Sequence, residues 1–207
     1  LRPFFATMYF AGLRPEEAVN LRWSDVELPE YTWNENEQVW VAPEDAWGEI
    51  TVHEVAPDVG RRWTDSGQQR DRRPPKGREE GESRHVPCVP QLSLILWEHR
   101  SLRVQGPNGL VFFGERGRQL ATSTYSKAWR RGREKALNSS EFASPLARRP
   151  YDLRSACVST WLKGAPPQQV AEWAGHSLDV LLRIYARILD GSEQESRRRM
   201  ASGFDGF

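Results

Sequence analysis

The extended segments of this chain are gathered in one stretch of the sequence, and helical patterns lie on both sides of it. No alternation of strand and helix runs along the chain, which disfavours a parallel sheet with crossover helices. The pattern instead predicts an α+β fold, mainly α, with helices around a small antiparallel sheet. The strand-like runs are 38–41, 49–55 and 84–89, and the helical patterns nearest to them are 2–12, 15–22, 90–104 and 122–137.

Glycine and proline mark the helix boundaries in the last third of the chain. Helices are predicted at 151–163, 167–174 and 178–188, followed by a polar helical tail near 192–200. Gly164 and Gly175 lie where helix C-caps are expected, and Pro166-Pro167 opens the next helix. Before this region we predict a short buried strand at 110–113, a helix capped by Thr122 or Ser123, and a polar linker over 138–149.

Charge is distributed unevenly along the sequence, although the formal net charge is only +1. Residues 16–58 contain twelve acids and one base, whereas residues 116–154 contain ten bases and three acids. Residues 61–84 add eight bases against five acids. This asymmetry favours a protein with one surface that faces nucleic acid, and a set of solvated charged faces is the alternative.

Composition excludes several classes of protein. No apolar run approaches the roughly 20 residues that a membrane-spanning helix needs. The first ten residues lack the features of a signal peptide and resemble the middle of a helix, so we expect the chain to begin inside a longer protein. Cys88 and Cys157 are far apart in apolar surroundings, which predicts buried free thiols and fits a reducing cytoplasm.

Four separated stretches supply the residue types that cut a DNA strand without a metal. Such a reaction needs a nucleophile, cations around the phosphate and an acid for the leaving oxygen. An isolated tyrosine phenol, with a pKa near 10, is a poor nucleophile until neighbouring groups favour its phenolate. The stretches are Gly12-Leu13-Arg14 with Glu17, Lys76 in an arginine-rich loop, Tyr151-Asp152-Leu153-Arg154, and Gly175-His176 followed by Tyr185.

In this order and spacing, the four stretches resemble the signature boxes of the tyrosine recombinases. That family has a Gly-Leu-Arg-x-x-Glu box, a β-hairpin lysine, a His-x-x-Arg box, and Gly-His followed nine residues later by the nucleophilic tyrosine. His176 and Tyr185 are nine residues apart. The resemblance covers roughly residues 1–190. The sequence that flanks the boxes looks most like that of integrases of actinobacterial mobile elements. The resemblance implies a catalytic domain with a three-stranded antiparallel sheet.

The resemblance also implies a role for each residue. Arg14 and Arg154 would hold the non-bridging oxygens of the scissile phosphate, and Glu17 would orient the site. Lys76 would protonate the departing 5′ oxygen, with Lys127 and Lys163 as less favoured alternatives. His176 would hydrogen-bond the phosphate. Tyr185 would form a 3′-phosphotyrosine link that conserves the phosphodiester energy, so neither metal nor ATP nor another cofactor is expected.

One position departs from the family pattern. Tyr151 stands where the family has the histidine of its His-x-x-Arg box, and Ser155 follows Arg154 where a histidine is frequent. A neutral phenol donates a hydrogen bond to phosphate but accepts a proton far less readily than imidazole at pH 7. We interpret Tyr151 as a tolerated substitute in an active enzyme. A Tyr151→His variant that cleaved orders of magnitude faster would contradict this interpretation.

These observations predict the domain organisation and the partners. Residues 1–190 form the catalytic domain, with an acidic β/loop insertion at 29–73, and 191–207 form a C-terminal tail. The tail is either a disordered end or, as the family resemblance implies, a segment that docks on a neighbouring protomer. The N-terminal core-binding domain of the family is absent from this chain. The expected partners are double-stranded DNA attachment sites, three further copies in a homo-tetramer, and accessory DNA-bending or directionality factors. A DNA-binding relic without strand transfer and a type IB topoisomerase remain as alternatives.

Overall fold

A computed structural model describes the chain except for residues 54–82, 103–105, 116, 191–196, 199–200 and 202–207. For residues 185–190 it describes the backbone only. The chain divides into two compact units, Leu1–Cys157 and Val158–Phe207, and each is described by itself below. The boundary falls within helix α6 (Asp152–Gly164). Lys76 and most of the polar tail lie outside the described residues.

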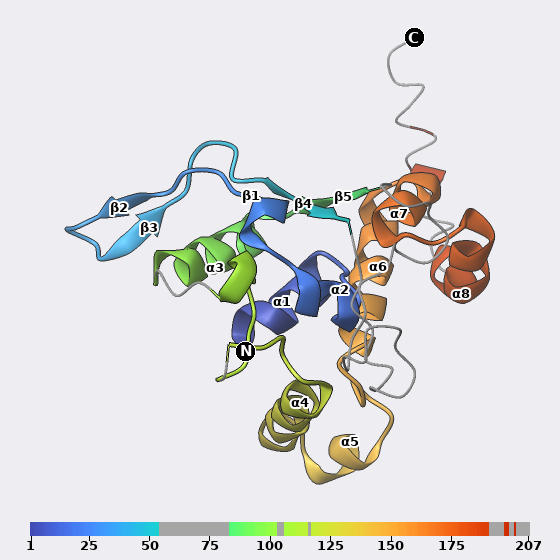
Figure 1. Cartoon of the computed structure of the whole chain (residues 1–207). Helices are drawn as coiled ribbons and strands as arrows, with labels where there is room; N and C mark the ends of the chain where they lie inside the picture. The colour runs from blue at the N-terminus through green and yellow to red at the C-terminus, as the bar shows by residue number, and fades with distance from the viewer. Residues whose placement is uncertain (54–82, 103–105, 116, 191–196, 199–200, 202–207) are drawn as a thin grey trace. The chain divides into compact units, whose positions relative to one another are not determined.

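The central sheet of the first unit has three antiparallel strands in the order β1-β4-β5, which confirms the predicted fold class (Figure 1). Val26 pairs with Ile50, and Ile50 pairs with Val86. These side chains are buried because alternate residues of a strand point to the same face. The strands are β1 (Val26–Glu27), β4 (Gly48–Val52) and β5 (Arg84–Cys88).

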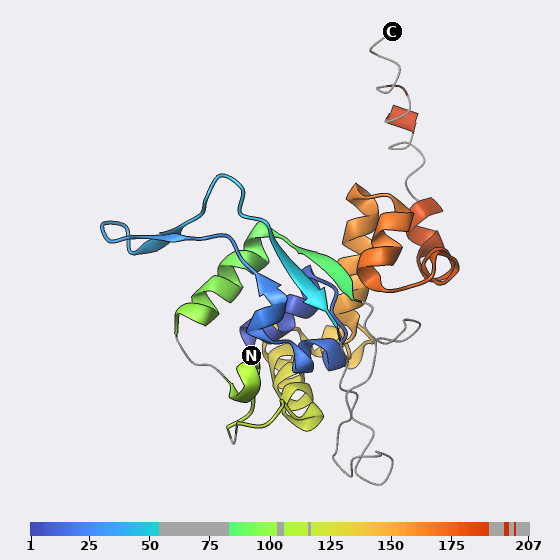
Figure 2. The ribbon, with the colours of Figure 1, turned by 45° about the horizontal axis from the view of Figure 1, so that its top comes forward.

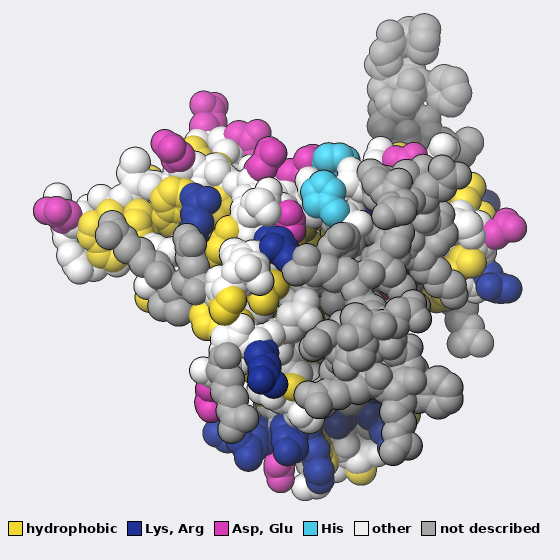
Figure 3. Space-filling view, in the orientation of Figure 1, with side chains coloured by type: hydrophobic (Ala, Val, Ile, Leu, Met, Phe, Trp, Pro, Cys, Tyr) yellow, Lys and Arg dark blue, Asp and Glu magenta, His cyan; other side chains and the backbone are white. Residues whose placement is uncertain are grey.

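A second, two-stranded ribbon is formed within the predicted acidic insertion. Strands β2 (Thr32–Asn34) and β3 (Val39–Val41) pair with Trp33 opposite Trp40, and these two rings meet edge to face. In Figures 1 and 2 this hairpin extends away from helices α1 and α2 of the same unit. Its apolar and acidic side chains gather together in Figure 3.

Helices surround the sheet of the first unit, and aromatic rings join several of them. Phe4 meets Phe112 and Tyr125 at centroid distances of 5.5 and 5.1 Å, and Phe5 meets Trp129 at 5.1 Å. These contacts fix α4 against α1. The helices are α1 (Arg2–Phe10), α2 (Pro15–Asn20), α3 (Pro90–Ser101), α4 (Thr122–Ala136) and α5 (Ser139–Ala143), with 3₁₀ turns η1 (Trp23–Asp25) and η3 (Pro107–Gly109).

The second unit packs three helical segments around a small apolar core. It contains the later part of α6, α7 (Pro167–Ala174) and α8 (Leu178–Asp190). As predicted, Pro167 is the first residue of α7, and Gly175 ends that helix in the left-handed region at φ 60°. Gly164 is the last residue of α6. The buried core is formed by Val158, Leu162, Val170, Ala171, Ala174 and Leu181.

Three local predictions were wrong. Leu110, Val111 and Phe112 are buried as expected, but only isolated bridges, Arg22 to Leu110 and Phe113 to Gln119, replace the predicted strand. The polar linker over 138–149 contains helix α5. The N-cap of α4 is Ala121, without a side-chain cap, so neither Thr122 nor Ser123 performs that role.

Among the described residues, no helix is both long enough and apolar enough to span a membrane.

Candidate active site

The Arg14 box folds as a tight turn into helix α2. Gly12 adopts the left-handed region at φ 57°, where a side chain would be strained, and Arg14 is extended as the N-cap residue. Pro15 at the first helical position fits because its fixed φ suits a helix and its missing N–H needs no partner there. The carboxylate of Glu17, in the first turn, accepts a 2.7 Å hydrogen bond from the Arg14 backbone N–H. The box therefore holds Arg14 and Glu17 together by local geometry.

Three arginine side chains converge on Glu17, whose side chain is completely buried. Arg14 donates to Oε1 at 2.8 Å. Arg84 donates to both oxygens, to Oε1 at 3.0 Å and to Oε2 at 2.8 Å. Arg154 lies farther away, with 4.0 Å between its Nη1 and Oε2. Two of the predicted site arginines, Arg14 and Arg154, are thus brought to the same carboxylate.

Arg154 is almost fully enclosed, with 1% of its surface exposed. It lies in the first turn of α6 and donates through Nη1 to the carbonyl of Gly12, in the turn before Arg14. Burial, followed by the positive charge of Arg14, lowers the pKa of Arg154, while Glu17 opposes this shift. Because a guanidinium remains charged at neutral pH, the fold maintains a buried cation beside a second one.

The electrostatics of Glu17 are set by these arginines. Burial alone would raise the pKa of Glu17, but the charges of Arg84, Arg154 and Arg14 outweigh it and lower the pKa to about 2. Burial works against the charge of Arg14, whereas Glu17 raises the pKa of this arginine. Glu17 is therefore ionised throughout the physiological range and holds the cations in place. Such a concentration of positive charge favours binding of an anion.

Tyr151 lies at the edge of this cluster. It precedes α6, and its backbone carbonyl accepts from the N–H of Arg154 at 3.1 Å. Its side chain is 38% exposed, in contrast to the buried Arg154 one turn later. The phenol contributes to the electrostatics of both Arg14 and Arg154. Tyr151 is thus partly open to solvent, next in sequence to the helix turn that carries Arg154.

His176 and Tyr185 lie in the second unit. The N–H of His176 donates to the carbonyl of Ala171 at 3.0 Å, which closes the C-terminal turn of α7 after the left-handed Gly175. The histidine is half-buried. Tyr185 lies on α8, and its side chain is outside the described residues. The fold thus joins this histidine and this tyrosine through one helix cap and the first two turns of α8.

The predicted site also includes a lysine that would protonate the leaving oxygen. Lys76 lies outside the described residues. Of the two alternatives, Lys127 is exposed on α4 and Lys163 is exposed near the end of α6. The assignment to Lys76 therefore stays a prediction from the sequence.

Arg84 is the residue of this cluster that the sequence reasoning missed. The sequence pattern indicates only that Arg84 begins a strand. Arg84, Val86 and Cys88 are buried while His85 between them is exposed, so the arginine lies on the apolar face of β5. A buried arginine needs an anionic partner, so this alternation could have identified it.

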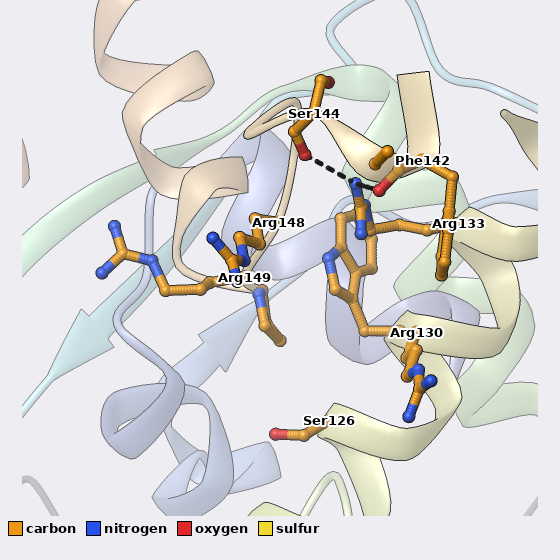
Figure 4. A pocket seen from close by; sticks show the side chains of 10 residues that line it. Ser126, Arg130, Arg133, Phe142, Ser144, Arg148 and Arg149 are labelled. Atoms are coloured by element: carbon orange, nitrogen blue, oxygen red, sulfur yellow. Dashed lines mark hydrogen bonds between the residues drawn. The ribbon is translucent and has the colours of Figure 1, made fainter. Parts of the chain in front are cut away.

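A basic cavity of about 450 Å³ lies between α4 and the segment that follows it (Figure 4). Arg133, which lines it, donates to the carbonyls of Leu146 at 2.8 Å and Phe142 at 3.1 Å and so fixes the segment. Arg130 and Arg148 also line the cavity and are exposed. In Figure 3, Lys and Arg side chains gather over the region of α4.

Metal ligands do not gather anywhere in the described part of the chain: no three His, Cys, Asp or Glu side chains there are placed to hold an ion.

No protein-family model matches the chain, and no curated protein matches it significantly. Solved structures do. The integrase of transposon Tn1549, in complex with transposon right-end DNA, aligns with a TM-score of 0.66 at 18% identity, over 96% of this chain and 58% of that one.

Two recombinases give further alignments. The site-specific recombinase XerH, bound to its difH substrate, aligns with a TM-score of 0.56 at 18% identity, over 87% of this chain and 41% of that one. The XerA recombinase aligns with a TM-score of 0.55 at 16% identity, over 95% and 62%. The chain thus spans less than two thirds of the length of each of these structures. With its three-stranded sheet and surrounding helices, the chain has the catalytic-domain fold of the tyrosine recombinases.

Proposed function

We propose that the chain is the catalytic domain of a site-specific DNA recombinase that cleaves and rejoins DNA through Tyr185. The observation that carries this proposal is the convergence of Arg14 and Arg154 on the buried Glu17, in a chain with the tyrosine recombinase fold. Two fixed guanidinium groups suit the non-bridging oxygens of one phosphate, because each presents a rigid fork of N–H donors.

The proposed reaction exchanges one ester bond for another. The phenol oxygen of Tyr185 attacks the scissile phosphorus, forms a 3′-phosphotyrosine bond and expels the 5′ oxygen of the DNA. Arg14 and Arg154 stabilise the charge that develops on the non-bridging oxygens, and His176 donates a hydrogen bond to one of them. Lys76 supplies the proton that the 5′ oxygen takes up. Attack by the 5′ hydroxyl of a second strand reverses these steps and releases Tyr185.

Tyr151 takes the place of a histidine in this scheme. Its exposed phenol donates a hydrogen bond to the phosphate and assists the two arginines. The proton of Tyr185 then passes to water, because a neutral phenol is a weak acceptor at pH 7. The enzyme therefore cleaves without a protein base at this position.

The basic face of α4 supplies the other contact with DNA in this proposal. Four exposed cations lie on this helix, with Glu134 as the exposed acid among them. Exposed cations bind phosphates of any sequence and release counterions, so we expect this part of the binding to depend on salt. The four are Lys127, Arg130, Arg131 and Lys135.

The partners in the proposed reaction are two duplexes with attachment sites, and four protomers act together on them, with accessory DNA-bending or directionality factors. The Tn1549 integrase and XerH structures are complexes with DNA, which supports a DNA partner. Neither metal nor ATP is required, because the phosphotyrosine bond retains the energy of the phosphodiester.

A nicked suicide duplex tests the proposal. The duplex carries a candidate attachment site, chosen as a sequence repeated on both sides of the gene. Its nick lets the cleaved end diffuse away, so that the covalent adduct accumulates on a denaturing gel. We expect the parent chain and a Tyr9→Phe control, changed at an exposed tyrosine of α1, to form the adduct. Tyr185→Phe should form none. An adduct that persists in Tyr185→Phe would assign the nucleophile elsewhere.

Two results favour the alternatives, one from this duplex and one from a separate plasmid assay. A parent chain that binds the duplex and forms no adduct is a DNA-binding relic, an idea favoured by the tyrosine at position 151. Relaxation of a supercoiled plasmid without an attachment site, lost in Tyr185→Phe, indicates a type IB topoisomerase.

A further inference from the structure

Arg84 enters the candidate site from strand β5, whereas Arg14 lies at the start of helix α2. Arg84 is the first residue of β5 and pairs with Val52 of β4. Only 2% of its surface is exposed, so its guanidinium is enclosed by protein. An arginine costs free energy to bury in this way unless a carboxylate compensates it.

The compensation comes from Glu17, which is 67 residues earlier in the chain. Both oxygens of the carboxylate accept from the two terminal nitrogens of Arg84, at 3.0 and 2.8 Å. Two parallel bonds between a planar guanidinium and a planar carboxylate fix the carboxylate in position and in rotation. A lysine would fix only its position, since it offers a point charge.

The same two oxygens hold Arg14. Oε2 accepts from the Arg14 backbone N–H at 2.7 Å, and Oε1 accepts from its Nη1 at 2.8 Å. The carboxylate of Glu17 is therefore shared between an enclosed arginine on one side and Arg14, whose side chain is 16% exposed, on the other. Any rotation of the carboxylate moves the guanidinium of Arg14 with it.

We propose that Arg84 is a positioning residue of the active site: it locks the carboxylate of Glu17, and through it sets the orientation in which Arg14 meets the scissile phosphate. The inference rests on the proposed function, since it names the phosphate as the ligand of Arg14. Arg84 itself does not touch the substrate, because both of its terminal nitrogens donate to Glu17. Its effect is therefore on the rate of the chemical step and not on the affinity for DNA.

The first test measures both quantities on the nicked duplex. At saturating DNA, we expect Arg84→Met to lower the single-turnover rate of adduct formation roughly 100-fold, as a displacement of about 1 Å does. The Kd for DNA should change less than about 3-fold, because an enclosed side chain adds little to the long-range field that attracts DNA. Arg84→Lys should recover part of the rate. Arg2→Met, at an exposed arginine of α1, serves as the control and should leave both values unchanged.

A double variant separates positioning from a general effect on the fold. If Arg84 acts through Glu17, then adding Arg84→Met to a Glu17→Gln chain should lower the rate by less than 3-fold further, since the lock is already lost. Multiplication of the two single effects would overturn the inference. So would an Arg84→Lys chain that is folded, by its thermal transition, and cleaves at the parent rate.

A second measurement does not depend on strand cleavage. In a chain with ¹⁵N-labelled arginine, inorganic phosphate should shift the side-chain Nε–H signals of Arg14 and Arg154. In Arg84→Met, or in Arg84→Lys where the methionine variant is unfolded, we expect saturating phosphate to shift the Arg14 signal by a different amount than in the parent, because the guanidinium meets the phosphate in another orientation. Equal shifts in parent and variant would overturn the inference, as would a parent in which phosphate does not reach these arginines. A parent that binds phosphate in this way but forms no adduct would refute only the proposed function.

Discussion

Two groups of basic residues in the first unit differ in almost every physical respect. Arg84 and Arg154 are enclosed, and with Arg14 they are held by a carboxylate with a pKa of about 2. The cations of α4 stand on an exposed helix face, visible in Figure 3, and their charges are surrounded by water. Arg14 and Arg154 of the first group are proposed to meet DNA phosphate, and so are the cations of the second group.

The difference lies in how much of the interaction is arranged before DNA arrives. An enclosed guanidinium held by fixed hydrogen bonds loses little freedom when it meets a phosphate, and it acts in a medium of low dielectric constant. An exposed lysine or arginine must give up rotamers and displace counterions. The first setting suits stabilisation of a transition state, and the second suits attraction to any DNA.

The largest effect is expected at Arg154. Arg154→Lys retains the charge but removes the fork of donors, so adduct formation on the nicked duplex should fall by about 10³-fold. Arg130→Lys, a matched change on the exposed face of α4, should stay within about 2-fold of the parent. Single-turnover rates at saturating DNA measure both. Equal losses of rate in Arg154→Lys and Arg130→Lys would show that the enclosed and the exposed cations do not differ in this way.

The next prediction concerns how much the charge of Glu17, which holds the enclosed arginines, contributes to the free energy of unfolding. Its pKa is about 2 in the folded chain against an ordinary value of 4.5, which corresponds to about 3 kcal/mol of stability at pH 7. Because the folded pKa is depressed, this contribution is fully present above pH 5 and is lost as the pH falls towards 2. Glu17→Gln should therefore lower the free energy of unfolding by about 3 kcal/mol at pH 7, with a smaller deficit at lower pH.

Urea unfolding between pH 7 and pH 3 measures this deficit. The control is Glu16→Gln, the neighbouring acid of the same helix turn, which is not enclosed. A deficit that is constant with pH would show that Glu17 stabilises the fold by packing and not by its charge.

The smallest effect is expected on the exposed helix. Replacing Arg130 and Arg131 with alanine should weaken DNA binding roughly 10-fold at 150 mM salt and reduce the slope of log Kd against log salt by about 2, one for each cation. The cleavage rate at saturating DNA should not change. Fluorescence anisotropy over a salt series checks the slope, and Glu134→Gln provides a change of opposite sign on the same face.

The sequence predicted local features well because their causes are local. Pro15 begins α2, Gly175 ends α7 and the antiparallel sheet forms with helices around it, all from proline, glycine and apolar periodicity. The pairing of Arg14 with Glu17 also lies within one helix turn. Helix α5 was missed although Asn138 and Glu141 form a reciprocal cap at its start, a signal that the sequence contains.

The features that the sequence did not predict depend on tertiary contact. Arg84 on β5 contacts Glu17 on α2, a pairing between residues far apart in the chain. Arg133 donates to backbone carbonyls, and residue types do not reveal which carbonyls lie near a side chain. The run at 110–113 is buried like a strand but finds only single bridges, because hydrophobicity specifies burial and not hydrogen-bond partners. The roles of all the predicted site residues stay predictions, and the side chains of Lys76 and Tyr185 also lie outside the described residues.

The two cysteines of the chain have a consequence for handling it in solution. Both are free and buried, as predicted, and burial raises the pKa of Cys88 to about 11 and that of Cys157 to about 12. At pH 7 roughly one thiol in 10,000 or fewer is ionised, and the thiolate is the reactive form. The cysteines of the folded chain should therefore react very slowly with alkylating reagents. A single cysteine placed at exposed Ser123, on the basic helix α4, can therefore carry a fluorophore. Slow labelling of Cys88 and Cys157 would report the rate at which the core opens.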